Sequence, residues 1–158
     1  MEGEPLNEHS PSRAETTICA RARTFAGELA DLREISRWTR EVCAATGLTP
    51  DRALDLELCL NEVAANIIHH GYDRSGPRPF SIWLTPTEGG VQARVEDFGR
   101  PFDPTRAPER DAPASLTDLT VGGYGIQIVR NLAQNLRYRR DGNRNVLTFG
   151  VSRPTGSP

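Results

Sequence analysis

The sequence predicts an α+β fold in which helices cover one face of a mostly antiparallel sheet. Two observations carry this prediction: apolar residues recur every three or four positions in some segments, and alternating segments come in adjacent pairs joined by short turns. In chain order the pattern is a strand, two helices, two strands, a long loop, a helix and two strands. Strands that are neighbours in sequence favour hairpins, so helices and strands should segregate into a two-layer sandwich.

The residue types at the ends of the segments set their predicted bounds. Thr49 and Pro50 are suited to the N-cap and first position of a helix, and Gly47 ends the helix before it. Glu88-Gly89-Gly90 predicts a turn between two strands. The predicted elements are a strand at 16–25, helices at 28–45 and 50–70, strands at 80–87 and 91–95, a helix from 122, and strands at 136–140 and 145–151.

One domain between two tails is the predicted organisation. Residues 1–15 are polar and predicted to be a disordered N-terminal tail, 16–151 form the domain, and 152–158 are a flexible C-terminal tail. Residues 104–121 carry no convincing period. A loop of that length inside a compact domain is typical of a functional lid.

Composition narrows the class of protein. A chain of 158 residues can bury a real core, and a formal net charge of −2 gives no reason to expect nucleic acid or an anionic membrane as partner. No apolar run is long enough to cross a bilayer, and no secretion signal is evident, so a cytoplasmic protein is expected. Cys19, Cys43 and Cys59 are predicted to be reduced core thiols.

All 19 basic residues are arginine, and the chain contains no lysine. A Walker A loop, the ordinary protein-kinase fold and Schiff-base chemistry each need a specific lysine, so all three are excluded. If this protein handles a nucleotide, it does so in another way. Arg137, Arg139 and Arg140 are interpreted as a solvated strand edge.

A polar stripe on the second long helix is the first candidate site. At about 100° per residue, Asp55, Cys59, Glu62 and Asn66 fall within about 60° of one another. Apolar residues flank the stripe, with Leu56, Leu60, Val63 and Ile67 on one side and Leu54, Leu58, Ala65 and Ile68 on the other. Glu62 can accept a proton, and the carbonyl oxygen of Asn66 suits a hard cation such as Mg²⁺. A solvated helix face is the alternative interpretation of this pair taken alone.

Asp97 and Gly99 form the second candidate site, at the end of a predicted strand. The carboxylate can accept a hydrogen bond from a ligand amino group, such as N6 of adenine, and the glycine allows close approach of the backbone. An ordinary Asp-x-Gly turn is the alternative.

Gly122, Gly123 and Gly125 surround Tyr124 at the start of a predicted helix, and they form the third candidate site. Exposed N–H groups and the helix dipole favour phosphate at such a position, although a lone glycine cluster is a weak signal.

In this order and context, the three motifs resemble those of the Bergerat-fold (GHKL) ATPases, which use no lysine-bearing phosphate loop. The segment from Asn61 to Tyr72 is similar to the Glu-x₃-Asn-x₃-His-Gly-Tyr form of the anti-sigma-factor serine kinases. Residues 102–104 and 122–130 match that branch as well. The resemblance covers about residues 16–151 and implies the Bergerat ATP-binding sandwich.

The resemblance also implies roles for the site residues. Glu62 would be the general base and Asn66 would hold Mg²⁺ on the triphosphate of ATP. Asp97 would accept the adenine amino group, Gly99 would admit the base, and the third group, Gly122, Gly123 and Gly125, would lie at the phosphates. Two departures from the branch are Tyr124, where leucine is usual, and Pro101, which replaces a frequent glycine.

The function implied is an ATP-dependent serine protein kinase that is also an anti-sigma factor. Such a protein phosphorylates a STAS-domain antagonist, sequesters a sigma factor and can form a homodimer. The alternative is a regulatory module that binds ATP and protein partners without phosphotransfer. The catalytic half of a two-component histidine kinase is less favoured, because no dimerisation helix is recognised before the domain.

Overall fold

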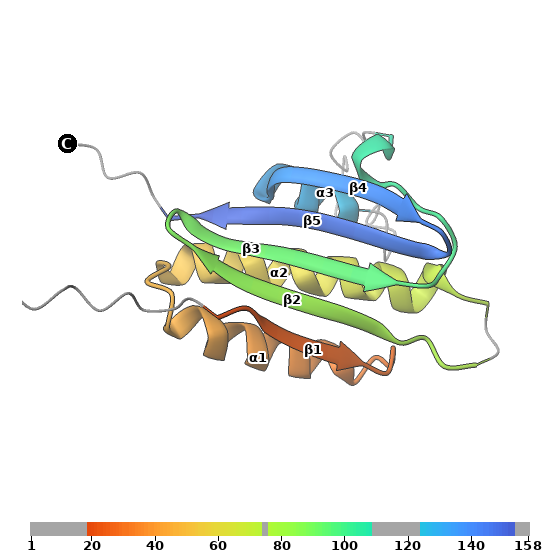
Figure 1. Ribbon diagram of the computed structural model, residues 1–158, viewed down its shortest axis with the longest axis horizontal. Helices are drawn as coiled ribbons and strands as arrows, with labels where there is room; N and C mark the ends of the chain where they lie inside the picture. Colours follow the sequence, from red (N-terminus) through yellow and green to blue (C-terminus); the bar gives the residue numbers. More distant parts are fainter. Residues whose placement is uncertain (1–18, 74–75, 109–123, 154–158) are drawn as a thin grey trace, which may run out of the picture.

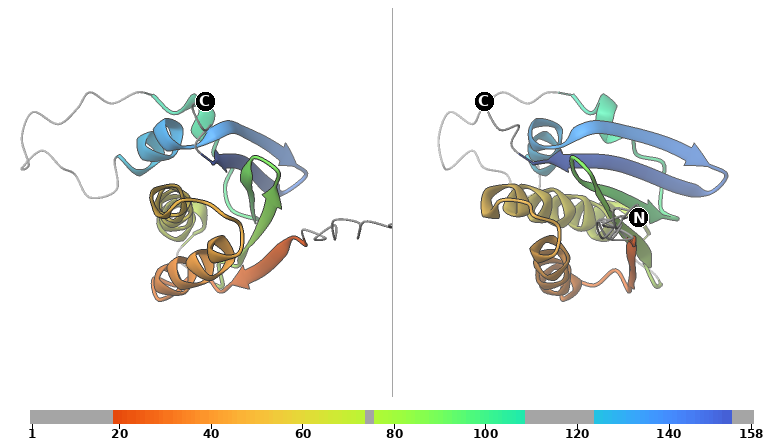
Figure 2. Two further views of the ribbon diagram at one scale, coloured as in Figure 1. Left: turned by 90° about the vertical axis from the view of Figure 1, so that its left-hand side faces the viewer. Right: turned by 60° about the vertical axis from the view of Figure 1, so that its left-hand side comes forward.

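The computed structural model describes residues 19–73, 76–108 and 124–153. In this part of the chain, five strands form one sheet in the order β1-β2-β3-β5-β4, with every neighbouring pair antiparallel. Figure 1 shows α1, α2 and α3 on one face of that sheet, and the end-on view in Figure 2 shows the sheet curving around them. The predicted two-layer α+β architecture is confirmed.

The elements follow the predicted order along the chain. Their bounds are β1 Arg21–Phe25, α1 Asp31–Ala44, α2 Pro50–Asn66, β2 Phe80–Thr87, β3 Gly90–Asp97, α3 Gly125–Leu132, β4 Gln134–Asp141 and β5 Arg144–Ser152. The prediction for β2 is confirmed residue for residue. The closing hairpin is confirmed as well, with strands that extend one or two residues beyond the predicted 136–140 and 145–151. None of the described helices combines the length and the apolar character that a membrane crossing needs.

Helix α1 begins three residues later than the sequence predicts. The Asp31 carboxylate accepts hydrogen bonds from the backbone N–H groups of Gly27, at 2.8 Å, and Glu28, at 2.9 Å. These bonds hold the preceding residues in a turn, because a side chain that binds backbone N–H groups competes with the helical pattern.

Helix α2 starts as predicted and changes geometry at its end. The Thr49 side chain accepts from the Arg52 N–H, and proline occupies the first turn. After Asn66 the chain continues as a π-helical turn, η1, over Ile67–Gly71. The carbonyl of Gly71 then accepts from the Arg100 N–H at 2.6 Å, which ties the end of this turn to the loop after β3.

The core lies between the helices and the inner face of the sheet. Phe25 stacks on Phe80, with ring centroids 5.5 Å apart, and both are buried. Cys43 and Cys59 are buried as predicted, and burial is the main cause that raises the pKa of their thiols to about 11 and about 12. Cys19 is exposed, so its prediction as a core thiol is wrong.

Candidate functional site

A pocket lies beside the end of β3, between the C-terminal half of α2 and the β4–β5 hairpin. It encloses about 440 Å³ of empty space, part of which is open to solvent. Asn66 and Asp97 line it together with Asn145, and apolar side chains such as Val95 and Leu147 form other parts of its wall. A mostly apolar wall with a few polar groups is typical of a small-molecule site.

A second pocket of about 280 Å³ adjoins the first. Glu62 and Gly125 line it, with the exposed His69 and His70 nearby on η1. Asn66 and Ile126 line both pockets, so the two lie next to each other at these residues. The structure therefore brings together Glu62, Asn66, Asp97 and Gly125, which the sequence analysis took from three separate motifs.

Glu62 and Asn66 lie one turn apart on α2, where α3 packs against it. A Cβ atom on residue 125 would collide with Oε2 of Glu62, so a larger residue there would displace this carboxylate from its present position. The small residue at 125 therefore leaves room for the Glu62 side chain at the second pocket.

The predicted polar stripe divides in the structure. Cys59 is fully buried in the core, as predicted for its thiol, so it does not share the more accessible surroundings of Glu62 and Asn66. A protonated thiol packs as a small apolar group, and this position lies at the margin of the buried arc of the helix. Asp55 pairs with Arg52 at 3.0 Å, and Leu54 and Leu58 are exposed on the far side of α2.

Asp97 is the last residue of β3 and its side chain is buried, at 7% exposure. Its Oδ1 accepts hydrogen bonds from the Gly99 N–H and from Nδ2 of Asn145, both at 2.8 Å. Burial raises the pKa of this carboxyl above its usual value, and the two hydrogen bonds and the nearby Arg140 charge partly oppose that rise.

Gly99 fills a place where a side chain cannot fit. A Cβ atom there would collide with the carbonyl oxygen of Gly71 on η1. The same loop is held by Tyr72, whose Oη accepts from the Phe98 N–H at 2.8 Å. The end of η1 therefore packs directly on the loop after Asp97. This packing requires a glycine at position 99, whether or not a ligand binds there.

Asn145, Tyr138 and Arg140 complete the site, and the sequence analysis did not select them as site residues. Arg140 was interpreted as part of a solvated strand edge. It is exposed on the edge strand β4, as that interpretation requires, and it also donates to the Gly99 carbonyl at 2.9 Å and to Oδ1 of Asn145 at 2.8 Å. Only the pairing register of β4 and β5, which places Arg140 opposite Asn145, reveals this contact. Gly122 and Gly123 lie outside the described residues.

Comparison with known proteins defines the class to which this fold and site belong. Residues 25–151 match the family model of the histidine kinase-like ATPase domain. The chain belongs to this family and carries its ATP-binding domain.

The relatives are serine kinases, which confirms the branch that the motifs resemble. The chain is 32% identical over 94 residues to the serine/threonine-protein kinase BtrW of Bordetella bronchiseptica, covering 60% of this chain and 66% of BtrW. It is 26% identical over 138 residues to the serine-protein kinase RsbW of Halalkalibacterium halodurans, covering 84% and 79%.

A solved structure of the RsbU and RsbW domains of Rv1364c from Mycobacterium tuberculosis has the same fold. Its TM-score is 0.58 at 18% identity, and the match covers 86% of this chain and 33% of that one. The chain thus spans about a third of this solved protein and just under two thirds of BtrW.

Proposed function

We propose that this chain is an ATP-dependent serine protein kinase that also acts as an anti-sigma factor. The observation that carries the proposal is the pair of adjacent pockets, with Asp97 lining one, Glu62 lining the other and Asn66 lining both. The pocket at Asp97 would take the adenine ring, and the pocket at Glu62 would take the reacting phosphate. The kinase names of the relatives support the same chemistry.

Asp97 and the glycines would bind the nucleotide. Asp97 would accept a hydrogen bond from the adenine amino group, and Gly99 would let the loop close beside the base. Gly122, Gly123 and Gly125 would lie at the phosphates, as in the family that the motifs resemble. Gly125 has the proximity to Glu62 that this placement requires.

Asn66 would hold Mg²⁺. Its carboxamide offers a neutral oxygen of the kind that hard cations accept, and its side chain lies at the boundary between the two pockets, where a triphosphate would run. The site therefore fits the ion, which would neutralise charge on the phosphates.

Glu62 would be the general base. It would take the proton of a serine hydroxyl as that oxygen bonds to the γ-phosphorus, while the bond from the γ-phosphorus to the β–γ bridging oxygen breaks and ADP leaves. The serine would belong to a STAS-domain antagonist, and a sigma factor would be the second partner. Both partners, and a homodimer, are inferred from the resemblance to the kinase branch.

Transfer from γ-labelled ATP to candidate STAS proteins tests the proposal. Glu62→Gln should retain ATP binding and slow transfer about 100-fold or more, as expected for loss of a general base. The matched control is Glu57→Gln on the same helix, because Glu57 pairs with Arg40 and lines neither pocket. Transfer by Glu62→Gln at the wild-type rate would exclude the general-base role.

Asn66→Ala tests the metal site in the same assay. It should abolish Mg²⁺-dependent ATP binding, whereas Asn61→Ala, which removes a contact with Ser36 away from both pockets, should not. Tight ATP binding without label on any serine would support the alternative, a binding module that transfers no phosphate.

A further inference from the structure

Among the described residues, the hydrogen bonds to Asp97 use one of its two carboxylate oxygens. In the described part of the chain, both hydrogen bonds to this side chain end on Oδ1, from the Gly99 N–H and from Nδ2 of Asn145. The side chain also lines the larger candidate pocket. Oδ2 is therefore the oxygen that remains for a ligand.

The amide of Asn145 can take only one orientation here. Its Oδ1 accepts from Oη of Tyr138 and from Nη1 of Arg140, both at 2.8 Å. Rotating the amide by 180° would turn its oxygen toward the Asp97 carboxylate and its NH₂ toward the Arg140 guanidinium, which loses both of those contacts and leaves the Tyr138 hydroxyl to accept instead of donate. Tyr138 and Arg140 thus direct Nδ2 toward Asp97.

The same groups attach the loop after β3 to the β4–β5 hairpin. Nδ2 of Asn145 also donates to the Arg100 carbonyl at 3.0 Å, and Arg140 donates to the Gly99 carbonyl at 2.9 Å. Asn145 is 6% exposed, so its amide is shielded from water, whereas Arg140 reaches the site from an exposed position on β4. The Asn145 amide therefore joins Asp97 and its loop to the hairpin, in addition to the contacts that Gly71 and Tyr72 make with the same loop.

A donor directed at Oδ1 favours the ionised form of a buried carboxyl. An ionised carboxylate only accepts hydrogen bonds, so Oδ2 suits a base with an amino group at this place. A base with a carbonyl oxygen there would bring two acceptors together.

We infer that Asn145, oriented by Tyr138 and Arg140, is a positioning residue that keeps Oδ2 of Asp97 as an acceptor and so selects 6-aminopurine over 6-oxopurine nucleotides. This inference rests on the proposed binding of the base at Asp97, and it adds the residues that determine base selectivity.

The test compares the dissociation constants of ATP and inosine triphosphate for the full chain. The two nucleotides differ only in the purine ring, where the amino group is replaced by a carbonyl oxygen and N1 carries a proton. The wild type should bind ATP at least about tenfold more tightly, the discrimination expected from one hydrogen bond to a charged group. Arg139→Gln is the matched control, because Arg139 pairs with Asp141 instead of with the site.

Two variants remove the contact in different ways. Asn145→Asp replaces the donor with an acceptor of the same shape and should lower the preference for ATP about tenfold or more. Tyr138→Phe leaves the amide in place with one donor fewer and should lower the preference about threefold. Because Tyr138 is only partly buried, this variant tests the inference even if Asn145→Asp does not fold.

Two results would overturn the inference. The first is that the wild type binds ATP and inosine triphosphate equally. The second is that in Asn145→Asp and Tyr138→Phe the affinities for ATP and for inosine triphosphate fall by the same factor, as a purely structural role would require. A wild type that binds no ATP would instead overturn the proposed function itself.

Discussion

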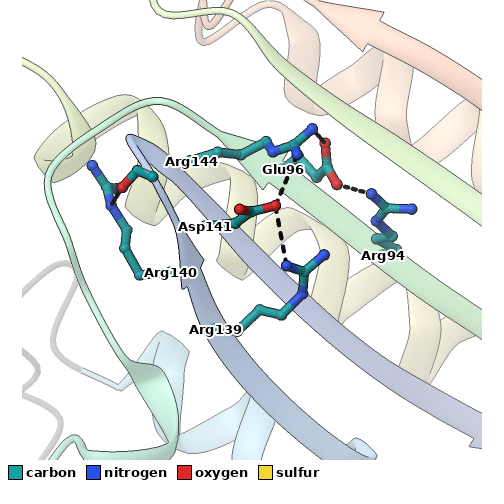
Figure 3. A network of polar contacts seen from close by, with 7 residues as sticks. Arg94, Glu96, Arg139, Arg140, Asp141 and Arg144 are labelled. Atoms are coloured by element: carbon teal, nitrogen blue, oxygen red, sulfur yellow. Dashed lines mark hydrogen bonds and ion pairs between the residues drawn. The ribbon is translucent and has the colours of Figure 1, made fainter.

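Glu96 and Asp97 are consecutive carboxylates at the end of β3, and they point to opposite faces of the sheet. Both are buried, at 6% and 7% exposure. Glu96 faces outward, where Arg94 binds its Oε1 and Arg144 binds its Oε2 at 3.1 Å (Figure 3). Asp97 faces inward, and its direct partners are a neutral amide and a backbone N–H.

The two sites differ in what remains for a ligand. Glu96 belongs to a series of ion pairs. Arg144 binds both Glu96 and Asp141, the latter at 3.0 Å, and Arg139 binds Asp141 at 3.2 Å (Figure 3). Asp97 keeps one oxygen without a partner in the described structure and lines a pocket. Burial alone therefore does not distinguish the two carboxylates; the type and number of their partners do.

The largest effect on ATP binding that this comparison predicts is that of Asp97→Asn. The variant keeps the shape of the side chain and removes the charged acceptor, so the ATP affinity should fall about tenfold to 100-fold, the range for a hydrogen bond to a charged group. Isothermal titration or fluorescent-nucleotide displacement measures it. An unchanged affinity would contradict the assignment of Asp97 to the base.

Glu96→Gln should have the opposite profile. It leaves two arginines without their shared anion, so the melting temperature should fall by about 3–8 °C, while the ATP affinity should stay as in the wild type. Calorimetry and the same titration measure both quantities. A loss of ATP affinity without loss of stability would mean that the outer face takes part in binding.

The pH dependence of ATP binding should separate the two carboxylates further. Because the pKa of Asp97 is raised, its protonation begins at a higher pH than for an ordinary carboxyl. Protonation removes the acceptor, so ATP affinity should be constant above this pKa and fall severalfold as the pH drops through it. His69 and His70 line the neighbouring pocket, so the matched measurement uses Asp97→Asn, in which this component should be absent.

Local sequence patterns predicted the helices and strands, and also those site residues that lie close together in the sequence. The period of a single element predicts strand β2 and places Asn66 one helical turn after Glu62. The residue type at Thr49 predicts where α2 starts. Asp97 could be selected because it ends a strand and precedes a glycine.

Contacts between distant segments could not be predicted in this way. Asn145 is 48 positions from Asp97, and the two meet because β3 and β5 pair in the register that places them opposite each other. A single sequence carries no local signal for that register. The π-helical turn at Ile67–Gly71 likewise depends on how α2 packs, which its period alone does not determine.

Arg139 and Arg140 repeat on β4 the contrast of Glu96 with Asp97, and the smaller predicted effects concern them. Arg140 donates to Asn145 and to the Gly99 carbonyl on the inner side. Arg140→Gln should weaken ATP binding about threefold to tenfold, since it removes a charged donor that positions the loop without contacting the base. An effect of this size is measurable by the titration used for Asp97→Asn.

Arg139→Gln should have the smallest effect of the series. Its contact with Asp141 joins two largely exposed side chains, 59% and 46% exposed, where water screens the attraction. The melting temperature should change by about 1 °C or less, and the ATP affinity should not change. If Arg139→Gln weakened ATP binding as much as Arg140→Gln, the hairpin as a whole would support the site, and the face toward which each side chain points would no longer explain which residues matter.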